Sequence, residues 1–140
     1  PLYAVKAGAK GDITLKAGEE SNEWVAWSRK GTGPGLPSPV AADGLLYTVG
    51  NTLNCHDAAT GEVVYKQRIN RAKTFVSSMM LAGGKLWLLD EGGQMFVVKA
   101  GRKFELLATN TLPDKIWSTP AADGATLLLC GLGTLYAVRE

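Results

Sequence analysis

The 140-residue sequence predicts an all-β protein made of repeated units of four short antiparallel strands. The strongest observation is that the turn dipeptides Asp43-Gly44, Gly83-Gly84 and Asp123-Gly124 recur at a constant interval, each directly before an apolar run. With 17 glycines, 6 prolines and no stretch of helical periodicity, the composition also favours many short strands over long helices.

The clearest unit spans residues 38–65, where turn formers separate four strand-like runs. A short first strand precedes Asp43-Gly44, and strands are predicted at residues 45–49, 53–56 and 62–67. The two middle runs are almost continuously apolar, as expected of strands covered on both faces. One such sheet cannot bury both of its faces alone, so the unit implies neighbours of the same kind.

The other units follow from this one by self-comparison. A serine precedes each turn at the same distance: Ser38, Ser78 and Ser118. Third strands are predicted at residues 2–5, 53–56, 95–98 and 135–138, and fourth strands at residues 12–16 (DITLK), 62–67 (EVVYKQ) and 104–108 (FELLA). An insertion within residues 18–36 explains the longer first interval. We therefore expect about twelve strands: the end of one unit in 1–16, complete units in 17–69 and 70–109, and the start of a last unit in 110–140.

A period of about 40–45 residues with four strands per unit is typical of a β-propeller, in which sheets stack radially around a channel. A two-sheet sandwich would need one polar face per strand, which LWLL from Leu86 and LLLC from Leu127 do not provide. About three blades are present. We therefore expect an incomplete ring, completed by further blades or by self-association.

Several of these runs resemble the repeat of pyrroloquinoline-quinone (PQQ) propellers. Residues 57–62, DAATGE, match its D-A-x-T-G core, with Tyr65 where that family prefers tryptophan. The LYAV runs at residues 2–5 and 135–138 match its third-strand signature, and Asp123-Gly124 matches its first turn. The resemblance covers nearly the whole chain. It implies a PQQ-like propeller fold and a periplasmic or extracellular location.

Two functions are compatible with this resemblance. Catalytic members of the family use a vicinal cysteine pair over the quinone, a calcium held by carboxylate and amide side chains, and a catalytic aspartate. Others, such as the propeller lipoprotein of outer-membrane barrel assembly, are non-enzymatic scaffolds. Here Cys55 and Cys130 are far apart in different apolar runs, and we expect two buried, reduced thiols. The favoured prediction is a non-catalytic scaffold without cofactor. The alternative is a fragment of a PQQ-dependent dehydrogenase whose quinone and calcium site lies in other blades.

The charge balance and hydropathy narrow the partners. Net charge is +2, with 15 basic and 13 acidic side chains, far from the balance of a dedicated nucleic-acid binder. No apolar run approaches the ~18–20 residues of a membrane-spanning helix. The single histidine, His56, is expected to be packed and hydrogen-bonded, because it stands in an apolar strand. We therefore expect a protein or another macromolecule as partner.

Candidate binding residues come from the connections between fourth and next first strands, which share one face of a propeller. These connections are predicted at residues 18–37, 68–76 and 109–117, and they are basic and aromatic. The candidates are Trp24, Trp27, Arg29, Lys30, Arg68, Arg71, Lys73 and Trp117. Such side chains could anchor an anionic ligand or a partner peptide. The alternative for each is a solvated or packed role, and Trp27 in particular would be core if it occupies the fourth strand of its unit.

Overall fold

The computed structural model describes residues 1–31 and 33–139, and that part of the chain contains thirteen β-strands and no helix. The strands are β1 (Leu2–Val5), β2 (Val25–Arg29), β3 (Val40–Ala42), β4 (Leu45–Val49), β5 (Leu53–Asp57), β6 (Val63–Gln67), β7 (Met80–Ala82), β8 (Lys85–Leu89), β9 (Gln94–Lys99), β10 (Leu106–Thr111), β11 (Ala121–Asp123), β12 (Thr126–Cys130) and β13 (Leu135–Arg139). None of these residues lies in a helix long and apolar enough to cross a membrane.

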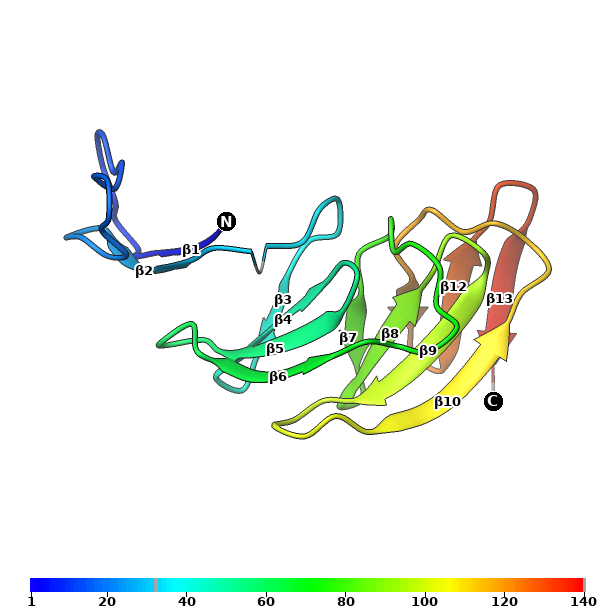
Figure 1. The fold of residues 1–140 in the computed structure, drawn as a ribbon. Helices are drawn as coiled ribbons and strands as arrows, with labels where there is room; N and C mark the ends of the chain where they lie inside the picture. The colour runs from blue at the N-terminus through cyan, green and yellow to red at the C-terminus, as the bar shows by residue number, and fades with distance from the viewer. Residues whose placement is uncertain (32, 140) are drawn as a thin grey trace.

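The strands form four antiparallel sheets that follow one another along the chain (Figure 1). The first sheet is β1-β2, the second is β3-β4-β5-β6, the third is β7-β8-β9-β10 and the fourth is β11-β12-β13. Each sheet pairs its strands in sequence order, as a meander does. The sheets are fanned and do not close into a barrel (Figure 1). The prediction of an all-β segment of propeller blades in an incomplete ring is confirmed.

The first sheet differs from its prediction. The expected fourth strand at residues 12–16 was wrong: these residues form no strand, and β1 pairs instead with β2, Ala4 lying opposite Trp27. Asn22 explains the choice, because its Oδ1 accepts bonds from the N–H groups of Trp24 (2.9 Å) and Val25 (2.7 Å), and its Nδ2 donates to Ile13 O (3.1 Å). Residues 6–24 are thus an insertion between third and fourth strands, and the first sheet ends at Arg29, not at residue 16.

The spacing of the repeat increases by one residue between the third and fourth sheets. The interval from Met80–Ala82 to Ala121–Asp123, which we call the longer step, exceeds the interval from Val40–Ala42 to Met80–Ala82 by one residue. Asp123 is therefore the last residue of a strand, and Gly124, with φ +56°, corresponds to Gly83, with φ +59°. The equivalence of the dipeptide Asp123-Gly124 with Gly83-Gly84 was wrong by one position.

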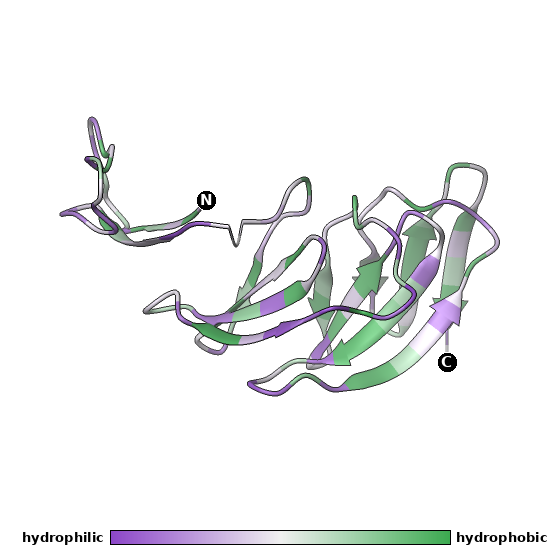
Figure 2. Ribbon diagram, in the orientation of Figure 1, coloured by the Kyte–Doolittle hydropathy of each residue, from purple (hydrophilic) through white to green (hydrophobic). Residues whose placement is uncertain are grey.

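The main core lies between the second and third sheets, where the middle strands of both turn apolar side chains toward each other. Tyr47, Leu53, Leu86 and Phe96 are among its fully buried members. A smaller cluster, which includes Ile116 and Leu129, joins the third sheet to the fourth. Figure 2 shows the green, apolar colour concentrated on these middle strands. Their continuous apolar runs are thus explained by burial on both faces, as predicted.

Trp27 joins the first sheet to the second. Its Nε1–H donates to the carbonyl of Ala58 at 3.0 Å, and its ring covers Gly61 so closely that a Cβ there would lie 2.6 Å from two ring carbons. Gly61 also has φ +72°, a conformation that glycine adopts without strain. The core alternative for Trp27 is confirmed. At the corresponding place in the second sheet, Tyr65 packs edge-to-face on Phe104 with ring centroids 6.1 Å apart.

Candidate binding face

The loops that follow β6 and β10 meet the turns that precede β9 and β13. We call this surface the loop face; it consists of residues 68–79, 90–93, 112–120 and 131–134. The N–H of Glu91 donates to Thr74 O at 2.9 Å, and the N–H of Leu132 donates to Lys115 O at 3.0 Å. Each incoming loop is thereby hydrogen-bonded to the hairpin turn of the sheet that it enters. The loop face is therefore held by backbone contacts.

We call the contact between an incoming loop and the hairpin turn of the sheet that it enters a junction. Asp90 organises the junction at the third sheet. Its carboxylate is fully buried; Oδ1 accepts from the N–H groups of Gly92 and Gln94, both at 2.9 Å, and Oδ2 accepts from Lys73 N at 2.8 Å. Three backbone donors compensate the cost of burying this charge. The DEGG segment is thus a hairpin turn, and Asp90 is a structural carboxylate.

Asp114 binds the turn of the fourth sheet from the other side of the junction. Its Oδ2 accepts from Gly133 N and Thr134 N, both at 3.1 Å, and its Oδ1 accepts from Lys115 N at 2.7 Å. The carboxylate belongs here to the incoming loop, whereas Asp90 belongs to the turn. A Cβ built on Gly131 would overlap this carboxylate and lie 2.6 Å from Asp114 Cγ.

The two junctions are therefore equivalent with their partners exchanged. The longer step between the third and fourth sheets relates Lys73 to Asp114, and Asp90 to Gly131. One side of each junction supplies a carboxylate, and the opposite side supplies a backbone N–H or the empty space of a glycine. One carboxylate at each junction is enough to bind the N–H groups of the turn.

Serine side chains hold the same junctions from the inside. Ser77 Oγ donates to Leu89 O at 2.8 Å, and Ser118 Oγ donates to Cys130 O at 2.6 Å, so these two serines are equivalent under the same longer step. Ser78, which the sequence grouped with Ser118, instead accepts a bond from Ser38 N at 2.8 Å. Ser118 therefore corresponds to Ser77, and its equivalence with Ser78 was wrong by one position.

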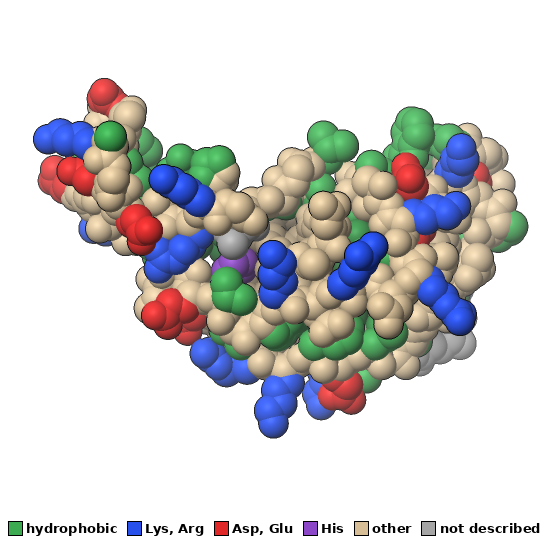
Figure 3. Space-filling model, in the orientation of Figure 1, with side chains coloured by type: hydrophobic (Ala, Val, Ile, Leu, Met, Phe, Trp, Pro, Cys, Tyr) green, Lys and Arg blue, Asp and Glu red, His purple; other side chains and the backbone are tan. Residues whose placement is uncertain are grey.

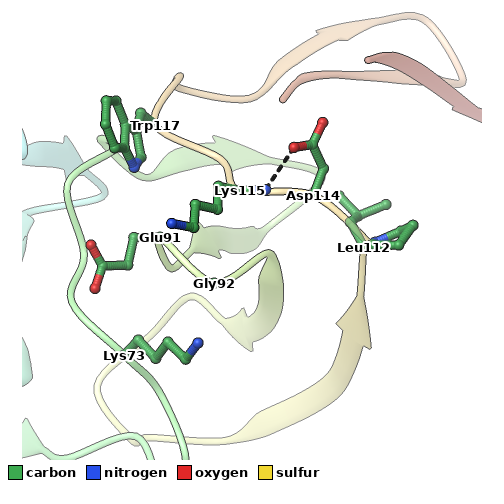
Figure 4. Close-up of a pocket in the computed structure, with 8 residues that line it drawn as sticks. Lys73, Glu91, Gly92, Leu112, Asp114, Lys115 and Trp117 are labelled. Atoms are coloured by element: carbon green, nitrogen blue, oxygen red, sulfur yellow. Dashed lines mark hydrogen bonds between the residues drawn. The ribbon is translucent and has the colours of Figure 1, made fainter. Parts of the chain in front are cut away.

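An open pocket of about 560 Å³ lies between the two junctions on the loop face (Figure 4). Lys73 and Lys115 extend their side chains toward it, Glu91 lies between them, and Trp117 stands at its rim (Figure 4). Leu112 and Pro113 complete an apolar part of the wall. Trp117 is 59% exposed, in contrast to the buried Trp27.

A second open pocket of about 510 Å³ continues the loop face toward the second sheet. Arg68 and Lys73 line it, so Lys73 belongs to both pockets. Arg71 lies in the same loop with φ +67°, and its carbonyl accepts a bond from Gln94 Nε2 at 3.3 Å. Of the eight candidate residues, Arg68, Arg71, Lys73 and Trp117 thus share the loop face.

The other four candidates lie elsewhere. Trp27 is packed, as described above, and Trp24 lies at the end of the insertion that precedes β2, where its carbonyl accepts from Lys6 N at 2.8 Å. Arg29 is half-buried; it pairs with Glu20 at 3.1 Å and donates to Thr60 O at 2.7 Å. Lys30 is exposed beside a separate pocket near the N-terminal strand. Trp24 lies away from the loop face because the insertion joins a third strand to a fourth, whereas Trp27 and Arg29 lie in β2 and Lys30 directly follows it.

Three side chains of the pocket were not among the sequence candidates. Glu91 was interpreted as part of a hairpin turn, and Lys115 lies among the basic residues of the predicted connection at 109–117. A signal was present for Asp114: it follows Lys73 at the same distance at which a glycine follows Asp90. This exchange of the carboxylate between the two sides of the junction can be recognised only once the longer step between the third and fourth sheets is known.

Metal-binding clusters, the cysteines and the histidine bear on the PQQ-like resemblance. No group of three or more His, Cys, Asp or Glu side chains in residues 1–31 and 33–139 could hold a metal ion. Cys55 is buried, and burial raises the pKa of its thiol to about 11. Cys130 is free and exposed, so the expectation of two buried thiols was wrong for Cys130, which stands at the last position of β12. His56 is fully buried, with Nδ1 3.3 Å from Gly61 O, as expected of a packed histidine.

Solved structures share this arrangement of sheets. BamB from Moraxella catarrhalis matches with a TM-score of 0.67 at 14% identity over 83% of this chain. The quinohemoprotein alcohol dehydrogenase ADHIIG from Pseudomonas putida HK5 matches with a TM-score of 0.61 at 14% identity over 74% of the chain. The chain has a PQQ-like β-propeller fold. A third match, with a TM-score of 0.56 at 14% identity over 69% of the chain, is the quinohemoprotein alcohol dehydrogenase of Comamonas testosteroni.

This PQQ-like propeller chain spans only part of those proteins: 37% of the BamB chain and 18% and 17% of the two dehydrogenases. A scan of protein families finds no match for its sequence, and a search of curated proteins finds none either. At so low a sequence identity the structural likeness concerns the fold, which BamB and the dehydrogenases have in common. Function has to be argued from the loop face itself.

Proposed function

We propose that this chain is a non-catalytic segment of a PQQ-like propeller that binds a protein partner through its loop face. The observation that carries the proposal is the pocket between the two junctions, where Lys73, Lys115 and the exposed Trp117 lie on loops that are hydrogen-bonded to the neighbouring turns. Tryptophan and basic side chains on a preformed surface are typical anchors for a partner. This hydrogen bonding matters because the anchors then lose little freedom on binding.

The chemistry of the titratable groups supports binding over catalysis. The buried carboxylate of Asp90 is already bound to three backbone N–H groups, and Asp114 likewise accepts from three. A general base needs a free lone pair aimed at a substrate. Burial lowers the pKa of His56, and its ring lies inside the second sheet, away from the loop face. No nucleophile–base pair is assembled among the described residues of the loop face.

Crosslinking tests this function directly. A photo-reactive benzoylphenylalanine placed at position 117 of the protein in its native cells should form a discrete adduct with one partner. The same group at position 103, an exposed lysine in the connection between β9 and β10, serves as the matched control. Adducts of equal pattern from both positions, or none from position 117, would refute a partner at the loop face.

The second candidate function is a segment of a PQQ-dependent dehydrogenase, favoured by the fold shared with two quinohemoprotein alcohol dehydrogenases. In that case the quinone and calcium site would lie outside these residues. Supplying PQQ and Ca²⁺ to the protein and following dye reduction with primary alcohols distinguishes the two. Turnover would establish the dehydrogenase; its absence, with a crosslinked partner, favours the scaffold.

We also propose a periplasmic or extracellular location, on the strength of the PQQ-like repeat in the sequence. Cell fractionation checks this independently of any partner. Recovery of the protein with cytoplasmic markers would contradict it.

A further inference from the structure

The basic side chains of the loop face have no acidic partners within the part of the chain that the structure describes. The ion pairs of that part are Arg29–Glu20, Lys99–Glu105 and Arg102–Asp57, and none of them lies on this face. Four basic side chains of the loop face thus remain outside any ion pair of the described residues: Arg68, Arg71, Lys73 and Lys115. Figure 3 shows blue basic side chains spread over the visible surface, and several of them near its centre have no red side chain beside them.

The acidic side chains of the same face are mostly satisfied. The carboxylates of Asp90 and Asp114 each accept three backbone N–H groups, which offset their negative charge locally. Glu91 is the exception: it is half-buried, lines the pocket and takes part in no ion pair of the described residues. The pocket therefore presents two free ammonium groups against one free carboxylate.

Lys73 and Lys115 are positioned by the junctions themselves. The backbone N–H of Lys73 is bound by Asp90, and that of Lys115 by Asp114. The stem of Lys73 also lies against Gly92, where a Cβ would come within 2.7 Å of its Cδ. A side chain whose stem is held in this way loses less conformational entropy when its ammonium group binds.

Trp117 adds an apolar contact next to these cations. Its side chain is 59% exposed at the rim of the pocket, and Leu112 and Pro113 line the wall beside it. A ligand that fits must carry both carboxylates and an apolar group. An extended acidic peptide has this combination, since side chains two positions apart point in the same direction and can bring two carboxylates and an apolar group to one pocket.

We propose that the loop face binds an acidic, extended peptide segment of the partner protein. Two of its carboxylates pair with Lys73 and Lys115, and an apolar side chain two positions from one of them packs on Trp117. This inference rests on the proposed function, for which it names the chemistry of the partner. Nucleic acid fits less well, because Glu91 lies inside the pocket and the whole chain carries a net charge of only +2.

Three nine-residue fluorescent peptides test the proposal: Ser-Glu-Ser-Glu-Ser-Leu-Ser-Glu-Ser, and two versions of it in which Gln or Lys replaces every Glu. Anisotropy titrations of the protein at low salt should give the tightest binding for the acidic peptide and the weakest for the basic one. Raising the ionic strength should weaken the acidic peptide most, because its contacts are screened. Single-stranded DNA of similar length is the competitor, and it should displace the acidic peptide poorly.

Variants locate the site. Lys73→Glu and Lys115→Glu should each weaken the acidic peptide by about tenfold. Glu91→Gln should tighten it about two- to threefold, since it removes the one free carboxylate of the pocket. Lys103→Glu, the same charge change on an exposed lysine away from the loop face, should have little effect. Unchanged urea midpoints for the four variants exclude unfolding as the cause.

The outcomes separate this inference from the proposed function. Equal binding of acidic and neutral peptides, displacement by DNA at equal concentration, or no acidic-peptide binding at about 1 mM overturns the acidic partner. A crosslinked partner at position 117 would still uphold a binding face in that case. If there is neither a crosslinked partner nor binding of the acidic peptide, both the proposed function and this inference are refuted.

Discussion

The exchanged carboxylates make a sharp prediction about the junction at the fourth sheet. Gly131→Asp alone places a second carboxylate where that of Asp114 already lies, since even a Cβ on Gly131 would be 2.6 Å from Asp114 Cγ. One of the two acidic side chains must then leave, together with some of the three N–H bonds that Asp114 accepts. With each such bond contributing about 1 kcal/mol net, and with repulsion added, we expect a loss of about 3 kcal/mol.

The double variant Gly131→Asp with Asp114→Lys reproduces the arrangement of Asp90 and Lys73 at the third sheet. Asp114→Lys alone should cost about 2 kcal/mol, because the turn loses its acceptor. The double variant should nevertheless be about 2 kcal/mol more stable than Gly131→Asp alone, since the new carboxylate can bind the same turn. The coupling between the two positions would then be favourable, as expected of residues in direct contact.

Urea unfolding of the four proteins of this cycle measures the coupling. Gly50→Asp is the matched control, because Gly50 holds the corresponding place in the second sheet and a Cβ there meets nothing within 4 Å. It should change stability by no more than about 0.5 kcal/mol. Additive effects in the double variant, or a Gly131→Asp as harmless as Gly50→Asp, would refute the exchange of partners.

Three further predictions concern the second sheet. Gly61→Ala should destabilise the protein by about 2 kcal/mol or more, because overlap with Trp27 adds to backbone strain. Gly44→Ala is the control: its φ is +73° against +72° for Gly61, but a Cβ there meets nothing, so only the strain of about 1 kcal/mol should appear. Equal losses of stability in urea titrations would contradict this. Burial lowers the pKa of His56 below its ordinary 6.5, so below that pH the unfolded chain binds a proton that the folded chain does not, and stability falls as the pH drops through 6.5. His56→Gln should abolish this dependence of the unfolding free energy on pH between about pH 7 and about pH 5. An unchanged dependence would mean that other groups cause it. Tyr65→Phe removes a buried hydroxyl that has no hydrogen-bond partner among the described residues, so it should raise the stability toward urea by about 1 kcal/mol. A decrease in stability would contradict this prediction.

The repeat in the sequence was enough to predict most of the fold. The third strands at Leu2, Leu53, Met95 and Leu135 were placed correctly, because each repeats the same short apolar run at the same place in its unit. The fourth strand of the first unit could not be placed in this way. DITLK has the alternation of a strand, but the side-chain bonds of Asn22 and the packing of Trp27 on Gly61 favour Val25–Arg29.

The candidate site was predictable in part. Basic and aromatic residues of the loops at 68–76 and 109–117 were expected to share one face, and the structure brings Lys73 and Trp117 to one pocket. Glu91 was not a binding candidate, because the local sequence of a turn does not show which side chains will lie near a charge in it. Trp24 could not be placed from the sequence, since the side of the sheet on which an insertion emerges depends on the strand pairing.

The sequence by itself determined the class of fold, the number of sheets and the positions of their middle strands, because turn formers and apolar runs record burial along the chain. The tertiary structure alone decided the longer step between the last two sheets and the sharing of one carboxylate at each junction by Asp90 and Asp114. The physical reason is that a carboxylate can satisfy the same backbone N–H groups from either side of a junction. Local pattern does not distinguish these two sides, and only the packing of one sheet on the next does.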